Sequence, residues 1–307
     1  MKETIGVLLM AYGSPKSLDG LVRYYTHIRN GIVPSAAEIE RLKERYMKIG
    51  GRSPLHEITF KEAELLAARL NAGGTSGYRV YVGMKHCTPF IEDAVKRMAD
   101  DGITRAVALV LAPHYSGMSV GAYFRRVSEK NACNGQKIRI RYVESWHTDD
   151  KFIEAVSMNI AKATKELDGG KKMVIFSAHS LPSGIRDNGD PYEAQLNETC
   201  SRVAGRLHID EWRLAYQSAP ATAENWLGPD IKDVMLDAAD SGYKDILVCP
   251  IGFVSDHLEI LHDIDIECKS LASSIGVKLV RAASLNTDPL FIDALAGIVR
   301  QALAGPD

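Results

Sequence analysis

The alternation of short apolar runs with amphipathic helical segments constrains the fold of this chain more than any other feature. Such runs, rich in Val, Ile and Leu, are typical of strands buried on both faces of a parallel sheet that helices cover. Because 307 residues exceed the usual size of one hydrophobic core, we expect two domains. The predicted strands of the two halves are Gly6–Gly13, Arg79–His86, Arg105–His114 and Ile138–Trp146, then Lys172–Ser180, Trp212–Ser218, Lys244–Phe253 and Val277–Ala282.

The two halves follow one plan. A helical segment after Pro89 and another after Pro229 both carry apolar residues at i, i+3, i+4, i+7 and i+8, and they end at Gly102 and Gly242. The offset is 140 at both landmarks (229 − 89 and 242 − 102). We therefore predict two similar α/β domains, each a four-stranded parallel sheet flanked by helices, over residues 1–146 and 147–307. The first carries an insertion near residues 14–70.

The first predicted strand of each half ends in a related turn, so Tyr12 and His179 occupy equivalent positions. The turns are Ala11-Tyr12-Gly13-Ser14-Pro15 and Ala178-His179-Ser180-Leu181-Pro182. Ligands of open α/β sheets bind outside the carboxyl ends of the strands, so we expect both side chains to project into one cleft between the domains. An imidazole there can exchange protons near neutral pH and can bind a transition metal.

A row of carboxylates follows the seventh predicted strand. Glu259, Asp263 and Glu267 are spaced i, i+4, i+8, which on an α-helix places them on one face at about 6 Å per step. Like charges at this spacing destabilise a helix unless a cation binds between them. The row therefore predicts a pathway for metal ions or protons, and a solvated acidic face is the alternative.

Composition excludes several functions. The 37 basic and 39 acidic residues nearly cancel, which argues against a nucleic-acid partner. No glycine-rich phosphate loop is present, so dinucleotide and ordinary nucleotide chemistry lack their binding motif. The five cysteines are far apart, without zinc or iron–sulfur spacing. We expect no signal peptide, because a strand-like apolar run begins at once at the N-terminus, and no membrane span, because the longest apolar runs are far too short. We expect a cytoplasmic, soluble enzyme.

Seven segments along the whole chain resemble the ferrochelatase family. They are Ala11-Tyr12-Gly13, Gly50-Gly51-Arg52-Ser53-Pro54-Leu55, Leu111-Ala112-Pro113-His114-Tyr115-Ser116, Ser177-Ala178-His179-Ser180-Leu181-Pro182, Gln217-Ser218, Trp226-Leu227-Gly228-Pro229 and Gly252-Phe253-Val254-Ser255-Asp256-His257-Leu258-Glu259. The resemblance implies a chelatase-like fold of two Rossmann-like domains. It also implies a lyase-class metal chelatase that inserts Fe²⁺ into a porphyrin during heme biosynthesis.

The resemblance is closest to the soluble Gram-positive type, which acts on coproporphyrin III, and protoporphyrin IX is the other candidate substrate. It implies that His179 and Glu259 are catalytic and carry iron, with Asp263 and Glu267 as an outer relay, and that Tyr12 is axial to the porphyrin metal. The porphyrin contacts that it implies are Tyr12, Arg29, Arg45, Tyr46, Ser53 and Tyr123. We expect a monomer with ferrous iron and porphyrin as substrates, no permanently bound cofactor, no iron–sulfur cluster and no integral membrane segment.

Two alternatives stay open. Another tetrapyrrole chelatase, inserting cobalt or nickel into sirohydrochlorin, would share the fold and the reaction class. A porphyrin or heme carrier without turnover would need no proton path, so the acidic row argues against it. Arg45 could instead form an ion pair on a surface helix, and Tyr123 could belong to the core.

Overall fold

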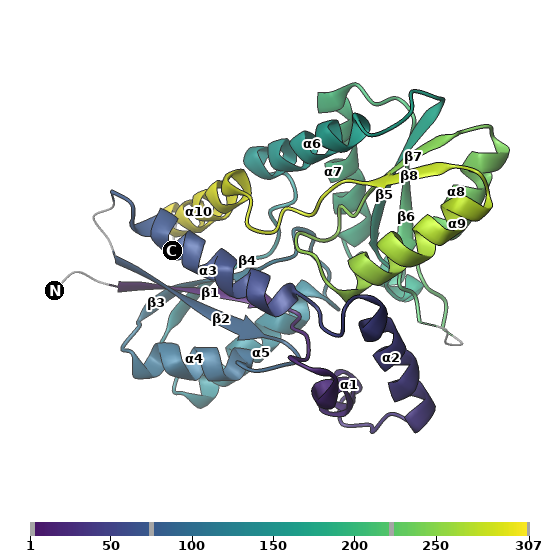
Figure 1. Ribbon diagram of the computed structural model, residues 1–307. Coiled ribbons are helices and arrows are strands. Elements are labelled where there is room, and N and C mark those ends of the chain that lie inside the picture. The colour runs from purple at the N-terminus through teal and green to yellow at the C-terminus, as the bar shows by residue number, and fades with distance from the viewer. Residues whose placement is uncertain (1–3, 74–76, 221–223, 306–307) are drawn as a thin grey trace. The chain divides into compact units, whose positions relative to one another are not determined.

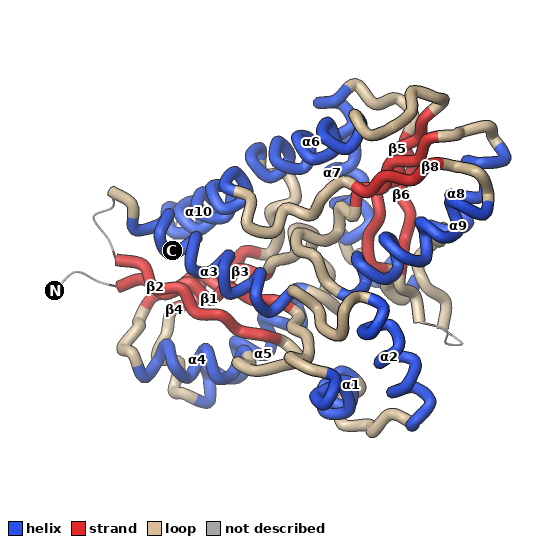
Figure 2. Tube along the Cα trace, in the orientation of Figure 1, coloured by secondary structure: helices blue, strands red, loops and turns tan. Residues whose placement is uncertain are grey.

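The computed structural model describes residues 4–73, 77–220 and 224–305, and it divides into two compact units. The first unit comprises residues 1–146 and 286–307, and the second comprises residues 147–285. Each contains one four-stranded parallel sheet with helices on both faces (Figures 1 and 2). All eight predicted strands are present. The first two begin and end two residues earlier than predicted, and the other six are shorter than predicted.

The sheet of the first unit has the strand order β2-β1-β3-β4. Its strands are β1 (Thr4–Ala11), β2 (Gly77–Met84), β3 (Arg105–Val110) and β4 (Arg139–Val143). Helices α4 (Ile91–Asp100) and α5 (Val120–Cys133) cover one face, and α3 (Leu55–Asn71) and α10 (Pro289–Ala304) cover the other (Figure 1). The segment between β1 and β2 also forms α1 (Leu21–Ile28) and α2 (Ala36–Lys48). Helix α2 is followed by a turn at Gly50 and Gly51, which have φ angles of 93° and 88°.

The sheet of the second unit repeats this order as β6-β5-β7-β8. Its strands are β5 (Lys172–His179), β6 (Trp212–Gln217), β7 (Asp245–Cys249) and β8 (Lys278–Arg281). The helices are α6 (Asp150–Thr164) and α7 (Tyr192–Leu207) on one face and α8 (Ile231–Asp240), the π-helix η3 (Ile260–Cys268) and α9 (Lys269–Ser274) on the other (Figure 1).

The repeat extends to single residues. Helices α4 and α8 bury their residues at the same positions, Ile91, Ala94, Val95 and Met98 in one and Ile231, Val234, Met235 and Ala238 in the other. Gly6 of β1 pairs with Ala106, and Met173 of β5 pairs with Ile246, which is 140 residues later (246 − 106). Gly6 and Met173 are therefore equivalent. Tyr12 lies six residues after Gly6 and His179 lies six residues after Met173, so the predicted equivalence of Tyr12 and His179 is confirmed.

The expected second domain, residues 147–307, differs from the unit observed. Residues 286–307 group with the first unit because α10 packs there. Phe291 lies against Trp146 at 5.9 Å between ring centroids, and Arg69 of α3 forms an ion pair with Asp293. These contacts join residues far apart in sequence, and the apolar periodicity of α10 does not reveal which sheet it covers.

Candidate active site

His179 is the last residue of β5, and the surrounding hydrogen bonds fix its backbone and its ring. The hydroxyl of Tyr192 donates to the His179 carbonyl at 3.0 Å, and the ring atom Nδ1 lies within hydrogen-bond distance of the Ser180 carbonyl. A carbonyl only accepts, so Nδ1 carries a hydrogen and Nε2 is the atom that faces other groups. The backbone at Gly252 packs closely against this strand end, since a Cβ at position 252 would lie 2.7 Å from Cβ of Ala178.

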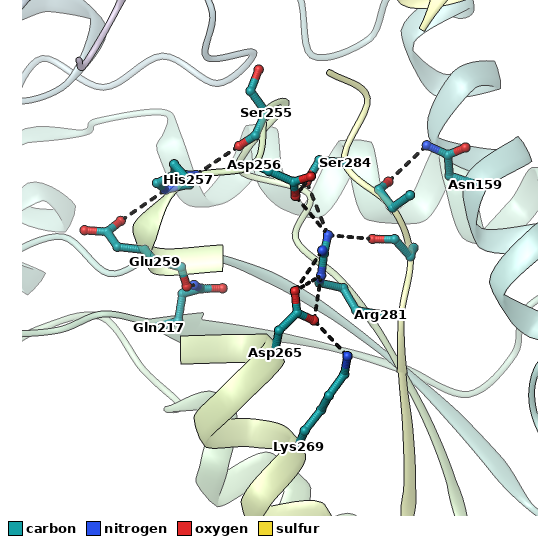
Figure 3. A network of polar contacts seen from close by, with 12 residues as sticks. Asn159, Gln217, Ser255, Asp256, His257, Glu259, Asp265, Lys269, Arg281 and Ser284 are labelled. Carbon is teal, nitrogen blue, oxygen red and sulfur yellow. Dashed lines mark hydrogen bonds and ion pairs between the residues drawn. The ribbon is translucent and has the colours of Figure 1, made fainter. Parts of the chain in front are cut away.

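Glu259 lies beside His179, at 3.5 Å from its Oε1 to Nε2 of the ring. Nε2 of His257 lies 3.5 Å from Oε2 of the same carboxylate. The side chain of Gln217 donates to the Glu259 carbonyl at 3.2 Å, and Ser177 in turn donates to Gln217 at 2.8 Å (Figure 3 shows Gln217, Glu259 and His257). One carboxylate thus stands between two imidazoles, while its backbone is held from β5 and β6.

The charges of His179 and Glu259 stabilise each other. Burial alone lowers the pKa of His179, but the Glu259 carboxylate outweighs it and raises that pKa to about 9. Burial alone raises the pKa of Glu259, and His179 followed by His257 holds it well below its usual range. At neutral pH the metal-free pair is an imidazolium and a carboxylate, so Nε2 must lose a proton before it can bind a metal.

The acidic row continues along η3, and here the predicted α-helical spacing is wrong. Residues 260–268 form a π-helix, with a wider turn and i to i+5 hydrogen bonds. Nδ1 of His262 lies 3.7 Å from Oε1 of Glu267, a pair at i, i+5 that an α-helix would separate by about 140°. The local spacing of charged and apolar residues does not distinguish this wider turn from an α-helix.

The outer carboxylates have polar and basic neighbours. Ser218, at the end of β6, donates to Asp263 at 2.6 Å, and Lys232 donates to Glu267 at 2.6 Å. His262 is buried, and its Nδ1 lies 3.0 Å from Oδ1 of Asp263. His262, Asp263 and Glu267 offer ligand atoms within 4.8 Å of one another, a donor set that suits a divalent cation.

In the first unit, the equivalent strand end carries a second cluster. Tyr12 follows β1 with 42% of its surface exposed, and its ring lies 4.5 Å from the ring of His86. Nδ1 of His86 lies 3.0 Å from Nδ1 of His27. Burial, followed by the charge of Lys85, lowers the pKa of His86 to about 3. The ring of Tyr12 therefore packs against the neutral imidazole of His86.

Basic groups surround this second cluster. The Lys85 ammonium lies 4.9 Å from the ring centroid of Tyr123, and burial followed by Arg126 lowers the pKa of Lys85 to about 8. Arg126 forms a bidentate pair with Glu92, at 2.6 and 2.9 Å, and also donates to the Lys85 carbonyl. Sequence reasoning missed His86 and Lys85, although both directly follow β2, at the strand edge where it placed Tyr12.

The other residues expected to contact the porphyrin differ in exposure. Tyr46, Ser53 and Tyr123 are buried, and Tyr123 belongs to the core of its unit, the alternative considered for it. Ser53 accepts a hydrogen bond from the amide of Leu55 at the start of α3. Arg45 is partly buried on α2.

Arg29 is also partly buried, and it donates to Glu38 at 2.6 Å. Glu38 is the third residue of α2 and completes a capping box with Ser35. Hydrogen bonds from Ser35, followed by the one from Arg29, hold the pKa of Glu38 at about 2. The guanidinium of Arg29 thus has a carboxylate partner before any ligand arrives.

The architecture is that of the chelatases. The chain has a TM-score of 0.58 and 14% identity with the sirohydrochlorin chelatase SirB from Bacillus subtilis subspecies spizizenii in complex with cobalt, covering 100% of this chain and 97% of that one. With CbiX, described as the terminal enzyme of siroheme biosynthesis in denitrifying bacteria, the TM-score is 0.55 at 14% identity, covering 97% and 100%. At such identity these likenesses show the fold alone.

Sequence similarity then gives the family. The ferrochelatase family model matches residues 4–303, and the chain belongs to that family. It is 45% identical to the coproporphyrin III ferrochelatase of Geobacillus thermodenitrificans, covering 99% of this chain and 97% of that one. It is 44% identical to the coproporphyrin III ferrochelatase of Halalkalibacterium halodurans, covering 99% and 98%. Among the helices that the structure describes, none has the length and apolar character to cross a membrane.

Proposed function

We propose that this protein is a ferrochelatase that inserts Fe²⁺ into coproporphyrin III during heme biosynthesis, as a lyase-class metal chelatase. The observation that carries the proposal is the contact between His179 and Glu259 at the end of β5, in a chain that belongs to the ferrochelatase family. A neutral imidazole and a carboxylate are suitable ligands for a ferrous ion that is held transiently. We assign both residues to iron binding and catalysis.

The reaction replaces two pyrrole protons with Fe²⁺, so the site must bind a cation and also manage protons. Fe²⁺ first displaces the Nε2 proton of His179, and the ionised Glu259 compensates part of the charge of the metal. The displaced proton passes to solvent. Once the iron has passed to the ring, the neutral imidazole of His179 accepts one pyrrole proton, and the second leaves to solvent past the carboxylates of η3. Asp263 and Glu267 extend the acidic surface along η3, and we assign them to an outer relay for cations or protons.

The porphyrin contacts are assigned to the first unit. Tyr12 is exposed at a strand end, and we propose that it approaches the porphyrin metal axially. Arg29 and Arg45 are partly exposed cations that suit porphyrin carboxylates. Porphyrin contacts of Tyr46, Ser53 and Tyr123 stay a prediction, and all three side chains are buried in this structure. Coproporphyrin III, with its four propionates, offers more partners to arginines than protoporphyrin IX does.

The direct test follows the Soret band during anaerobic incubation with Fe²⁺ and either coproporphyrin III or protoporphyrin IX. We expect turnover with both and a higher kcat/KM for coproporphyrin III. Turnover with sirohydrochlorin and cobalt instead would favour the other chelatase class, and tight porphyrin binding without metallation would favour a carrier. A cytoplasmic monomer without permanent cofactor or iron–sulfur cluster stays a prediction, which sizing and iron and sulfide analysis of the purified protein can test.

A further inference from the structure

We infer that Arg281 is a positioning residue for Glu259, because it holds the segment that carries Glu259 from both sides. This inference rests on the proposed role of Glu259 in iron binding. Arg281 is the last residue of β8, and its side chain is 13% exposed. Its guanidinium lies between Asp256 and Asp265, which precede and follow Glu259 in the chain (Figure 3).

The two carboxylates contact Arg281 differently. Asp265 meets it side by side, with Nε 3.0 Å from Oδ1 and Nη2 2.9 Å from Oδ2. Asp256 contacts Nη1 at 3.2 Å through Oδ1, which also accepts a hydrogen bond from Ser284 at 2.8 Å. Lys269 contacts Asp265 at 3.1 Å. Since a guanidinium has donors in a fixed planar fork, these contacts define both the distance and the orientation of the two aspartates.

The Asp265 contact depends on the π-helical register. Asp265 lies in the middle of η3. If this segment were an α-helix, a shift of the register by one residue would turn the Asp265 side chain about the helix axis by about 100°. The guanidinium of Arg281 would then no longer contact both carboxylate oxygens of Asp265. The ion pair therefore stabilises the wide turn, which would otherwise compete with the ordinary α-helix.

The Asp256 contact acts on the other side of Glu259. The next residue is His257, whose Nδ1 lies 3.0 Å from the Ser255 carbonyl and whose Nε2 faces Glu259. Asp256 thus anchors the turn that presents His257 to the carboxylate. With both ends of the 256–265 segment attached to one side chain, the position of Glu259 beside His179 depends on Arg281.

The test uses Arg281→Lys and Asp265→Asn and measures Co²⁺ binding to the porphyrin-free protein. Lysine keeps the charge but lacks the fork, and asparagine keeps the shape but loses the charge. We expect each variant to bind Co²⁺ about tenfold more weakly, as is common when a group that orients a metal ligand is changed. Coproporphyrin affinity, followed through the Soret shift, should stay within twofold. Arg202→Lys, which changes a surface pair with Glu198, is the matched control and should change neither affinity.

A merely structural role would lower the melting temperature and leave the Co²⁺ affinity of the folded protein unchanged. That result in either variant overturns the inference, and Asp265→Asn decides the matter if Arg281→Lys does not fold. In a Glu259→Gln background, Arg281→Lys should weaken Co²⁺ binding less than twofold further, because its effect passes through Glu259. A full tenfold loss there would also overturn it. Absence of ferrochelatase turnover in the parent would refute the proposed function without affecting these binding results.

Discussion

On the proposed role of His179, the affinity for a divalent metal should rise steeply with pH, because the metal would displace a proton from its ring. Burial opposes a charged imidazole, yet the Glu259 carboxylate raises the pKa of His179 to about 9. The folded, metal-free protein therefore holds a proton on Nε2 at neutral pH, on the atom that the metal needs. The perturbation is simply the pH of a binding titration.

The size of the effect follows from the pKa. With a pKa of about 9, only about 1% of His179 is neutral at pH 7, so the proton weakens metal binding there by about 100-fold. Below the pKa, each further pH unit should cost about tenfold in apparent affinity. Between pH 8 and pH 6 we expect a loss of about 100-fold. Glu259 stays ionised over this range, since its pKa is held well below its usual value.

The assay is a Co²⁺ titration of the porphyrin-free protein in buffers that do not bind the metal. Without porphyrin, no pyrrole proton contributes to the pH dependence. In Glu259→Gln the largest attraction is gone, so the pKa of His179 falls. Affinity should be weaker overall and should change less between pH 6 and pH 8 than in the parent. A parent affinity that does not change between pH 6 and pH 8 would refute the reasoning, since His179 would then already be neutral.

Further variants test the remaining assignments. His179→Ala should abolish metallation while the porphyrin affinity stays within about tenfold of the parent. Tyr12→Phe should retain part of the metallation rate, because the aromatic ring remains. If both variants lose the steady-state rate equally, Tyr12 is an obligatory ligand. Arg45→Ala should reduce the preference for coproporphyrin III over protoporphyrin IX by up to roughly 1.5–3 kcal/mol, the contribution of a hydrogen bond to a charged group. An unchanged ratio of the two kcat/KM values would mean that Arg45 does not contact the substrate. In an iron titration, Glu259→Gln should lower kcat severely, and Glu267→Gln should mainly raise the iron requirement; equal, small effects would favour a solvated acidic face.

The sequence predicted the two sheets and the equivalence of Tyr12 and His179 because these depend on local patterns. Continuous apolar runs identify strands buried on both faces, and the helices after Pro89 and Pro229 repeat the same apolar spacing. The sequence could also predict the contact between His179 and Glu259, since His179 ends one strand and Glu259 follows the carboxyl end of another strand of the same sheet.

Other features depend on contacts between residues that are distant in sequence. The spacing of the acidic row fits an α-helix, and nothing local indicates that Asp265 meets Arg281 and thereby favours a π-helix. The same holds for α10, whose apolar face could have covered either sheet. His86 was missed for a different reason: burial, followed by Lys85 and His27, lowers its pKa, and His27 lies on a helix of the insertion.

The repeated fold places an imidazole near the same strand edge in each unit and then gives it opposite electrostatic surroundings. Burial lowers the pKa of His86, the nearby charges of Lys85 and Arg126 lower it further, and the ring stays neutral. His179 has Glu259 and Asp263, whose negative charges keep it protonated despite burial. A basic cluster favours an anionic ligand, and an acidic cluster favours a cation. The reaction that we propose needs one of each, a porphyrin with carboxylate side chains and a ferrous ion. On the proposed assignments, the charges at the carboxyl edges of two similar sheets would favour the porphyrin carboxylates in the first unit and the ferrous ion in the second.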